Sequence, residues 1–381
     1  MKRAIKTKNS VEHFKRPRES ASASSSANVS DATPVPTSTP ALHPPVGEDA
    51  VSEGDNLGCE RQLRLNMSIP VVDFSVYELE KTNVSDDKFE KLSKELRKAF
   101  VEVGFVYLKN TGIHQEEVDK VMDISRQFFC LSEDKKKPFS RGDFSCNCNH
   151  GWVSLEKESL NPQRPGDLKE AFNITSLRKD IDWPSEGVED FRDGMVSFFN
   201  RCKDLSLRVL RVMAIGLGLE PKVFLEAHKH IGSDKNDTTL RTLYYPPLKS
   251  DVLKPNQLRC GEHSDYGCIT LLFQSPEGGL QVFSRTGEYI SIPAISGTVV
   301  VNIADLMQRW TSDVYVSSVH RVLLPAVSDN RTRQSLAFFV HPDNEAIISC
   351  CDGSDKYPPV NSIDYLLSRF KESYGKKSDN L

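Results

Sequence analysis

The feature that most constrains the fold of this chain is a series of short apolar segments that begins at about Leu240. The seven segments are RTLYY, CITLLF, LQVF, YISI, TVVVNI, VHRVLL and QSLAFFV, and Gly, Pro and Asn residues lie between them. β-Branched and aromatic residues in runs of this length, bounded by turn-forming residues, predict β-strands. Seven short strands within about a hundred residues, with few helices between them, indicate a jelly roll or a barrel.

The part of the chain before these segments is predicted to be mainly helical. Phe89, Leu92, Leu96 and Phe100 recur at helical spacing, and Gly104 follows them as a stop signal. Further helices are predicted at 115–131, 188–217, 304–310 and 361–375, and strands at 68–74 and 105–113. The patterns together predict an α+β fold with a mainly β core that is flanked by N-terminal helices.

Composition and charge exclude some partners. No apolar run approaches the roughly 18 residues that a membrane-spanning helix needs, so we expect no membrane partner. The net charge of −4 over 381 residues does not favour nucleic acid as a partner. Nine cysteines without a regular spacing are typical of reduced thiols, which predicts a cytoplasmic location.

Residues 1–65 differ from the rest of the chain. They are basic at the start and then rich in Ser, Ala, Pro and Thr, with almost no periodic apolar signal, which predicts a disordered tail. The pairs Lys2-Arg3 and Lys15-Arg16 resemble a bipartite nuclear import signal, and a solvated basic arm is an equally good interpretation. The nucleus is therefore an alternative to the cytoplasm.

A candidate metal site lies within the predicted strands. His263 and Asp265 are two residues apart in GEHSDYG, and side chains two apart on a strand point to the same face. His320, in the segment VHRVLL, is available as a third ligand from a neighbouring strand. Two imidazoles and one carboxylate on one octahedral face leave open positions, as in non-haem Fe(II) sites that activate O2, whereas zinc favours a tetrahedral site.

A second pair of polar residues follows on the last predicted strand. Arg333 and Ser335 are two apart in RTRQSLAFF and share one face of that strand. A guanidinium beside a hydroxyl can bind a carboxylate through charge-assisted hydrogen bonds. The pair therefore implies a dicarboxylate cosubstrate near the metal.

With these motifs in this order, the chain resembles the isopenicillin N synthase-like branch of the 2-oxoglutarate and Fe(II)-dependent dioxygenases. The resemblance runs from Ile69 to about Pro342 and includes IPVVDF, AFVEVGFVYLKNTGI, GDLKEAFNI, RTLYYPP and GGLQVF. It implies a distorted double-stranded β-helix, or jelly roll, in which residues 66–190 form an N-terminal dioxygenase region and 191–381 the catalytic region, with its core at about 236–343.

The resemblance also implies roles for the residues singled out above. His263, Asp265 and His320 would be the iron ligands, and Arg333 and Ser335 would bind the far carboxylate of 2-oxoglutarate. Tyr245 matches a tyrosine that commonly helps there. Leu243 stands where many plant members have an Asn, so that position is not expected to contact the cosubstrate.

Three hypotheses about function follow. The favoured one is a dioxygenase that uses Fe(II), 2-oxoglutarate and O2 to oxidise, most simply to hydroxylate, a small organic molecule with release of succinate and CO2. The second is an Fe(II)-dependent oxidase or cyclase that does not use 2-oxoglutarate. The third is a non-catalytic ligand-binding member of the fold. The substrate and the oligomeric state stay open, and a monomer is compatible with the sequence.

Other polar or aromatic groups are weaker candidates. CNCNH at 146–150 lacks the second ligand pair of a structural zinc site and is interpreted as a loop. HKH at 228–230 is interpreted as a solvated part of a helix, and the lysines at 135–137 are interpreted as a charged helix end. Trp310 and Phe339 could line the substrate pocket but fit the core better, and Glu262 could orient a metal ligand.

Overall fold

The structure is a computed structural model that describes residues 68–374 except for 83, 143–148, 176, 178–180, 249–252 and 327–329. The predicted disordered tail at 1–65 and both cysteines of CNCNH lie outside the described residues. Within the described residues, none of the helices is long and apolar enough to cross a membrane.

Two β-sheets form the centre of the fold. The larger sheet has the strand order β1-β2-β10-β7-β12-β5-β4-β3, and the smaller has the order β6-β11-β8-β9. The strands of the larger sheet are β1 (Val71–Asp73), β2 (Phe105–Lys109), β3 (Gly151–Val153), β4 (Glu170–Ile174), β5 (Thr239–Tyr245), β7 (Ile269–Gln274), β10 (Thr298–Ile303) and β12 (Arg333–Val340). The strands of the smaller sheet are β6 (Cys260–His263), β8 (Leu280–Phe283), β9 (Tyr289–Ser291) and β11 (His320–Val322), and β13 (Ile347–Ile348) pairs with β14 (Val360–Asn361) apart from both sheets.

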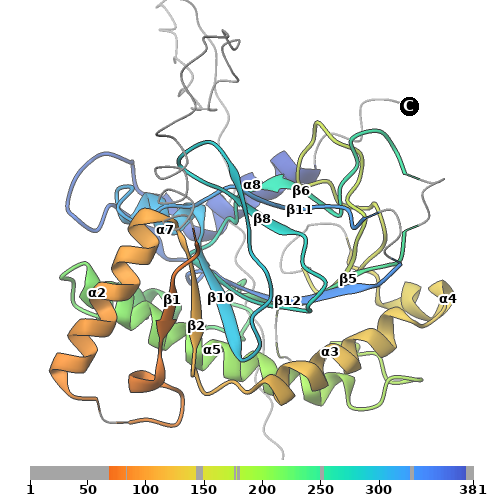
Figure 1. The fold of residues 1–381 in the computed structure, drawn as a ribbon, viewed down its shortest axis with the longest axis horizontal. Coiled ribbons are helices and arrows are strands. Elements are labelled where there is room, and N and C mark those ends of the chain that lie inside the picture. Colours follow the sequence, from red (N-terminus) through yellow and green to blue (C-terminus); the bar gives the residue numbers. More distant parts are fainter. Residues whose placement is uncertain are drawn as a thin grey trace, which may run out of the picture. The chain divides into compact units, whose positions relative to one another are not determined.

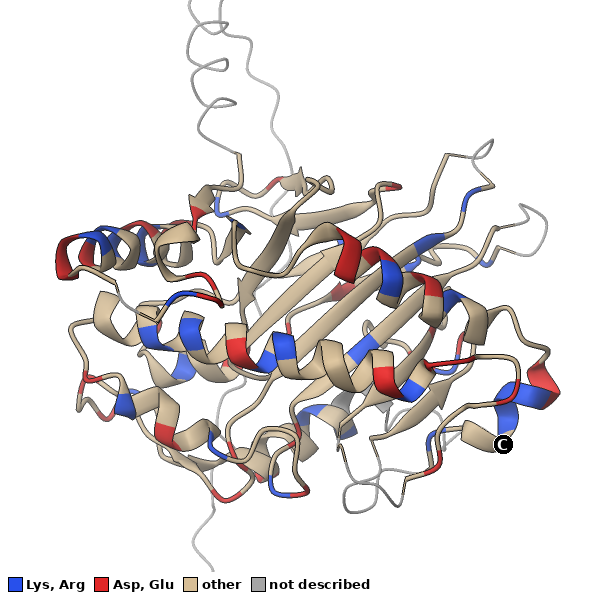
Figure 2. Cartoon of the chain, turned by 90° about the horizontal axis from the view of Figure 1, so that it is seen from below, with Lys and Arg blue, Asp and Glu red and all other residues tan. Residues whose placement is uncertain are grey.

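Three helices contact the larger sheet and cover its outer face, namely α2 (Asp86–Glu102), α3 (Gln115–Phe129) and α5 (Phe191–Gly216) (Figure 1). The other described α-helices are α4 (Glu133–Lys136), α6 (Lys222–Leu225), α7 (Asp305–Trp310) and α8 (Ser362–Tyr374). The long helix α5 contacts α2, α3, β7 and β12. Figure 2 shows that the charged residues gather on the helices, while the strands behind them are mostly uncharged.

Successive side chains along each strand point to opposite faces of the sheet, which divides the interior into two layers. On β12, Leu336, Phe338 and Val340 belong to the core between the larger sheet and the helices. The alternate residues point the other way because successive side chains on a strand lie on opposite faces. Arg333 and Ala337 accordingly line the space between the two sheets. The same alternation on β5 and β7 creates a sandwich interior that accommodates polar side chains.

The predicted elements are largely confirmed. Each of the seven predicted strand segments contains a strand, and the five predicted helices form with ends that differ by a few residues. The strands β3 and β4 were not predicted. They are short, and β4 (EAFNI) reaches its pairing partner β5 only across 64 residues of intervening chain, so no local alternation or turn marks it.

The interpretation of HKH as solvated was wrong for His228, whereas the charged helix end at 135–137 forms as predicted but with one of its lysines buried. His228, in HKH, is buried at 1% exposure and stacks on Trp310, and only His230 of the two histidines is exposed. Lys136, one of three successive lysines, is also buried, and its ammonium pairs with Glu170 at 2.7 Å. In both cases a tertiary partner overrides the expectation that a polar helix end is solvated.

Candidate metal site and adjoining pockets

His263 and His320 face each other across two paired strands. His263 is the last residue of β6, His320 is the first of β11, and the two are direct partners in the antiparallel register. Their ring centroids lie 4.3 Å apart. Pairing across neighbouring strands therefore brings together two imidazoles that are 57 positions apart in sequence.

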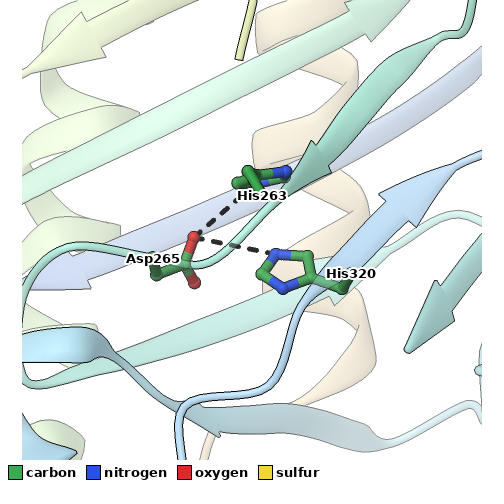
Figure 3. Close-up of side chains that lie close together, drawn as sticks. All are labelled: His263, Asp265 and His320. Atoms are coloured by element: carbon green, nitrogen blue, oxygen red, sulfur yellow. Dashed lines mark ion pairs between the residues drawn. The ribbon is translucent and has the colours of Figure 1, made fainter. Parts of the chain in front are cut away.

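Asp265 lies close to both histidines, although it is not on the same strand as His263, contrary to the prediction from the sequence. β6 ends at His263, and Asp265 lies in the turn that follows. Its Oδ1 atom lies 3.7 Å from Nε2 of His263 and 3.7 Å from Nε2 of His320. Figure 3 shows the carboxylate directed toward both rings. The prediction that these residues converge is correct, but a turn and not a shared strand face brings Asp265 into place.

Hydrogen bonds fix the orientation of all three side chains. Thr270 Oγ1 and Asn302 Nδ2 donate to Asp265 Oδ2 at 2.6 Å and 2.8 Å, which leaves Oδ1 toward the histidines. Nδ1 of His263 donates to Gly261 O at 2.8 Å, and Nδ1 of His320 faces Ser318 O at 3.1 Å. A carbonyl oxygen only accepts, so each Nδ1 carries the proton and each Nε2 keeps a free lone pair.

Burial and charge determine the protonation of the cluster. Burial, together with the neighbouring His263, lowers the pKa of His320 to about 4, so its imidazole is neutral at pH 7. Burial raises the pKa of the Asp265 carboxyl, but the charge that the two imidazoles carry when protonated and the hydrogen bonds from Asn302 and Thr270 outweigh it and lower that pKa overall. The cluster thus offers the neutral imidazole of His320 beside a carboxylate.

These donors fit a transition-metal ion. One ligand atom from each of the three residues lies within 4.8 Å of the other two, and this is the one such group among the residues that the structure describes. Two imidazole nitrogens and one carboxylate oxygen that converge in this way match the two-histidine, one-carboxylate set that holds non-haem Fe(II). The residues present therefore fit iron.

A pocket between the two sheets reaches from this cluster to Arg333, and we call it the Arg333 pocket. Ser335 lies 3.4 Å from the Arg333 guanidinium, which stacks on the ring of Tyr245 at 4.7 Å. Arg333 is 1% exposed, and the pKa of Tyr245 is raised by burial. The structure thus brings the three sequence-predicted residues together, and Leu243 lines the same pocket with an apolar side chain.

A second pocket opens on another side of the cluster and is closed by α8, and we call it the Phe370 pocket. It is lined by Asn149, Glu158, Leu160, Asn173, Thr239, Arg241, His263, Ser264, Asp265, Tyr266, Phe339, His341, Leu366 and Phe370. Trp310 packs in the core against Phe224, as the sequence favoured, whereas Phe339, for which the core was also favoured, lines both pockets.

Several residues of the Phe370 pocket were not found from the sequence. Asn173 and Arg241 come from β4 and β5, and only their alternation with buried apolar neighbours could have placed them toward the interior. Arg241 donates two hydrogen bonds to Glu158, at 3.1 Å and 2.6 Å. Asn173 Nδ2 donates to Asn149 at 3.0 Å, while among the described residues its buried Oδ1 has no hydrogen-bond partner. The pocket therefore presents both a cation and an unpaired acceptor.

Comparison with known proteins agrees with this geometry. Residues 236–342 match the 2OG-Fe(II) oxygenase superfamily, and residues 69–192 match the family described as non-haem dioxygenase in morphine synthesis N-terminal. The 2-oxoglutarate-dependent dioxygenase htyE of Aspergillus rugulosus is 30% identical over 341 residues, which cover 81% of this chain and 100% of that protein. The chain therefore belongs to the 2OG-Fe(II) oxygenase superfamily and is a 2-oxoglutarate-dependent dioxygenase.

Solved structures show the same fold. The crystal structure of full-length Neurospora crassa T7H in complex with alpha-KG has a TM-score of 0.69 at 35% identity and covers 79% of this chain and 95% of that one. The complex of the same protein with alpha-KG and thymine has a TM-score of 0.69 at 34% identity, with coverages of 80% and 96%. The jelly roll, the oxidoreductase class, and the use of Fe(II), 2-oxoglutarate and O2 are thereby confirmed.

Proposed function

We propose that this dioxygenase hydroxylates a small planar heterocycle, of which a pyrimidine base is the best candidate, while 2-oxoglutarate is converted to succinate and CO2. The observation that carries the proposal is the Phe370 pocket, which combines aromatic walls with a polar end directly beside the metal cluster. The similar Neurospora protein has been crystallised with thymine, which supports the same substrate class here.

His263, Asp265 and His320 would hold the iron through Nε2, Oδ1 and Nε2. Bound Fe(II) supplies the redox chemistry by which O2 oxidises both the keto acid and a substrate C–H bond. The carbonyl acceptors at Nδ1 orient both imidazoles so that each Nε2 faces the position of the metal. Thr270 and Asn302 keep one carboxylate oxygen of Asp265 occupied, so that the other is available to the metal.

Arg333, Ser335 and Tyr245 would bind the far carboxylate of 2-oxoglutarate. The guanidinium is already held by Gly278 O at 2.8 Å and by Gln274 at 3.1 Å, so it does not need to reorganise on binding. Its burial in a low-dielectric interior strengthens the attraction for a carboxylate. The keto acid would extend from this end of the pocket to the metal cluster.

The Phe370 pocket would select a planar ring with hydrogen-bonding edges. Tyr266, Phe339 and Phe370 offer aromatic surface for the faces of such a ring. The unpaired Oδ1 of Asn173 would accept a ring N–H, and Arg241 would donate to a ring carbonyl. A pyrimidine base such as thymine carries both groups on one edge, which would direct its opposite edge toward the metal.

The proposal can be tested with purified full-length protein, Fe(II), 2-oxoglutarate and O2. We expect thymine to raise succinate formation above the background without substrate, and mass spectrometry to show a product heavier by one oxygen atom. Thymine methylated on both ring nitrogens keeps the planar ring and both carbonyls but cannot donate to Asn173, and we expect it to give the background rate.

Different outcomes separate the class of reaction from the substrate. Succinate at the background rate with every pyrimidine base would refute the substrate proposal without affecting the family assignment. Equal rates with thymine and its dimethylated form would show that Asn173 does not select the substrate.

Location and assembly are separate proposals. The cytoplasmic location rests on the cysteine pattern, and the nuclear alternative rests on the basic tail, which lies outside the described residues. Imaging the full-length protein beside a variant without residues 1–18 tests both. A monomer and independence from nucleic acid are likewise proposals, which size-exclusion chromatography with and without added DNA would test.

A further inference from the structure

The strand that carries His263 lies at the end of the smaller sheet. β6 is the first strand in the order β6-β11-β8-β9, so within the described part of the chain its outer edge has no neighbouring strand in that sheet. Backbone N–H groups on such an edge need another partner when they are buried. For Gly261 that partner is a side chain, because its N–H donates to Oδ1 of Asp167 at 3.0 Å.

Asp167 belongs to a loop that is remote in sequence from the metal cluster. The 154–169 loop connects β3 to β4 and precedes β6 by about 90 residues. Asp167 is 2% exposed, and its Oδ2 accepts hydrogen bonds from Lys169 Nζ at 2.5 Å and from Leu160 N at 3.3 Å. Three donors therefore hold one buried carboxylate in a single orientation.

The residue that Asp167 holds also orients the metal-binding imidazole. Gly261 donates its N–H to Asp167, and its carbonyl accepts the Nδ1–H of His263 at 2.8 Å. A Cβ atom at position 261 would lie 2.9 Å from Asn161 Cβ, which shows how closely the loop packs on the strand. A displacement of Asp167 would thus be transmitted through one residue to His263.

A second set of contacts joins the loop to the same strand. Arg164 donates to both carboxylate oxygens of Glu262, at 2.6 Å and 2.8 Å, and Asn161 Nδ2 donates to Glu262 at 3.1 Å. Glu262 thus bonds to the loop, and also to Arg321 at 3.1 Å. The loop therefore holds two successive residues of β6, one through the backbone and one through the side chain.

The loop also reaches the Phe370 pocket. Lys169 Nζ lies 3.2 Å from Glu158, and Glu158 in turn accepts both hydrogen bonds from Arg241. The two cations Lys169 and Arg241 and the two carboxylates of Glu158 and Asp167 therefore form a buried group in which the charges balance. The same loop thus holds the strand of a metal ligand and the guanidinium that would bind the substrate.

We propose that Asp167 is a positioning residue for His263, and that the 154–169 loop sets the metal affinity of the site by holding β6 from its outer edge. The inference rests on the proposed role of His263 as a metal ligand. It goes further because it assigns the N-terminal half of the chain a direct part in building the metal site.

The test is the affinity of the substrate-free protein for Mn(II), followed by the electron paramagnetic resonance signal of the free ion. Asp167→Leu removes the acceptor for Gly261, and we expect metal binding about 10- to 100-fold weaker, as for other groups that orient metal ligands. Asp167→Asn keeps an oxygen acceptor but loses the charge beside Lys169. We expect it to lose comparable thermal stability and yet to keep an affinity close to that of the wild type.

Lys136→Met is a matched control, because it removes another buried ion pair, with Glu170, that does not contact β6. We expect it to lower the thermal stability without changing Mn(II) affinity. Wild-type affinity in Asp167→Leu, or equal losses in Asp167→Leu and Asp167→Asn, would overturn the proposal.

Arg164→Gln decides the question if Asp167→Leu does not fold, since Arg164 is 25% exposed and its loss should be tolerated. We expect it to weaken Mn(II) binding, and wild-type affinity in this folded variant would overturn the proposal. If the wild-type protein itself bound no Mn(II) or Fe(II), the proposed function would fail, which is a different result from a variant that binds like the wild type.

Discussion

Arg333 is held on all sides before any ligand arrives. Its Nε donates to Gly278 O, one terminal nitrogen to Gln274, and its plane lies over Tyr245. Each of these contacts fixes the direction in which the remaining guanidinium face can bind an anion. Geometry, and not charge alone, should therefore determine the affinity for 2-oxoglutarate.

The substitution Arg333→Lys tests this. Lysine keeps the charge but cannot form the same fork of hydrogen bonds, so we expect the KM for 2-oxoglutarate to rise by about tenfold or more. Steady-state kinetics with varied 2-oxoglutarate would measure the change. Asn173→Ala is the control at the Phe370 pocket, where we expect a higher KM for the organic substrate and an unchanged KM for 2-oxoglutarate. A similar KM for 2-oxoglutarate in wild type and Arg333→Lys would contradict the role of the fork.

At the residue scale, the sequence could predict the groups that follow a strand period. Arg333 and Ser335 share a face because they are two apart on β12, and the structure places them as expected. Thr270, Asn302 and Asp167 could not be found this way. Each reaches its partner only through the register between strands or the path of a long loop, and a single sequence contains neither.

Helix α8 connects the end of the chain to the metal site. Its residues Leu366 and Phe370 line the Phe370 pocket, and Arg369 donates to Asp305 at 3.0 Å and stacks on Tyr266 at 4.9 Å. Asp305 in turn accepts a hydrogen bond from Ser264, which lies between His263 and Asp265 in the sequence. The position of α8 therefore depends on contacts made by the same turn that carries Asp265.

Removing those contacts with Arg369→Ala should loosen the closed side of the substrate pocket. We expect the KM for the organic substrate to rise by about tenfold, the value of one charge-assisted hydrogen bond, and succinate formation without hydroxylated product to increase. The ratio of succinate to product would measure this uncoupling. Lys371→Ala, at an exposed position of the same helix, serves as the control. An unchanged ratio in Arg369→Ala would show that α8 is held by its apolar contacts alone.

The junction between α2 and β2 depends on one glycine. Gly104 has a φ of +75°, and a Cβ atom there would lie 2.1 Å from the carbonyl oxygen of Val316. Gly218, after α5, has the same φ but open space around its Cα. Substituting alanine at each position in turn therefore distinguishes the cost of backbone strain, which both share, from the cost of a steric clash, which only Gly104 has.

We expect Gly218→Ala to lower the free energy of unfolding by about 1 kcal/mol, because alanine is strained at positive φ. Gly104→Ala should cost about 2 kcal/mol more, since the backbone of Val316 must move as well. Denaturation in urea would give both values. Equal losses in the two variants would mean that the neighbouring chain moves aside freely.

At the element scale, the period of the hydrophobic residues was sufficient to predict helices and strands that are long or strongly patterned, but not short ones. The helix α5 and the strand β12 follow clear periods of 3.6 and 2, and both were predicted. The prediction that β6 extends through Asp265 was wrong, because nothing local distinguishes a polar strand end from the turn after it. That turn is nevertheless what allows the carboxylate to face both histidines.

Taken as a whole, the molecule buries several histidines in their neutral form. Burial lowers the pKa values of His228 and His341 from 6.5 to about 4, and that of His150 to about 4 as well. Trp310 stacks on His228, while His150 lies edge-on to Phe172 and Trp183. Protonating any of these rings in the folded state would place a charge among apolar side chains.

These shifts predict how the stability of the whole protein depends on pH. Between about pH 6.5 and pH 4 the unfolded chain binds protons that the folded chain excludes, so stability is fully present above pH 6.5 and is lost as the pH falls toward 4. A shift of this size contributes up to about 3 kcal/mol per histidine. Urea denaturation of the metal-free protein at pH 7 and pH 5 would measure the loss, and His228→Phe should reduce it because one proton-excluding group is gone. A free energy of unfolding that is the same at both pH values would mean that these rings take up protons in the folded state, and that the interior around Trp310 admits water.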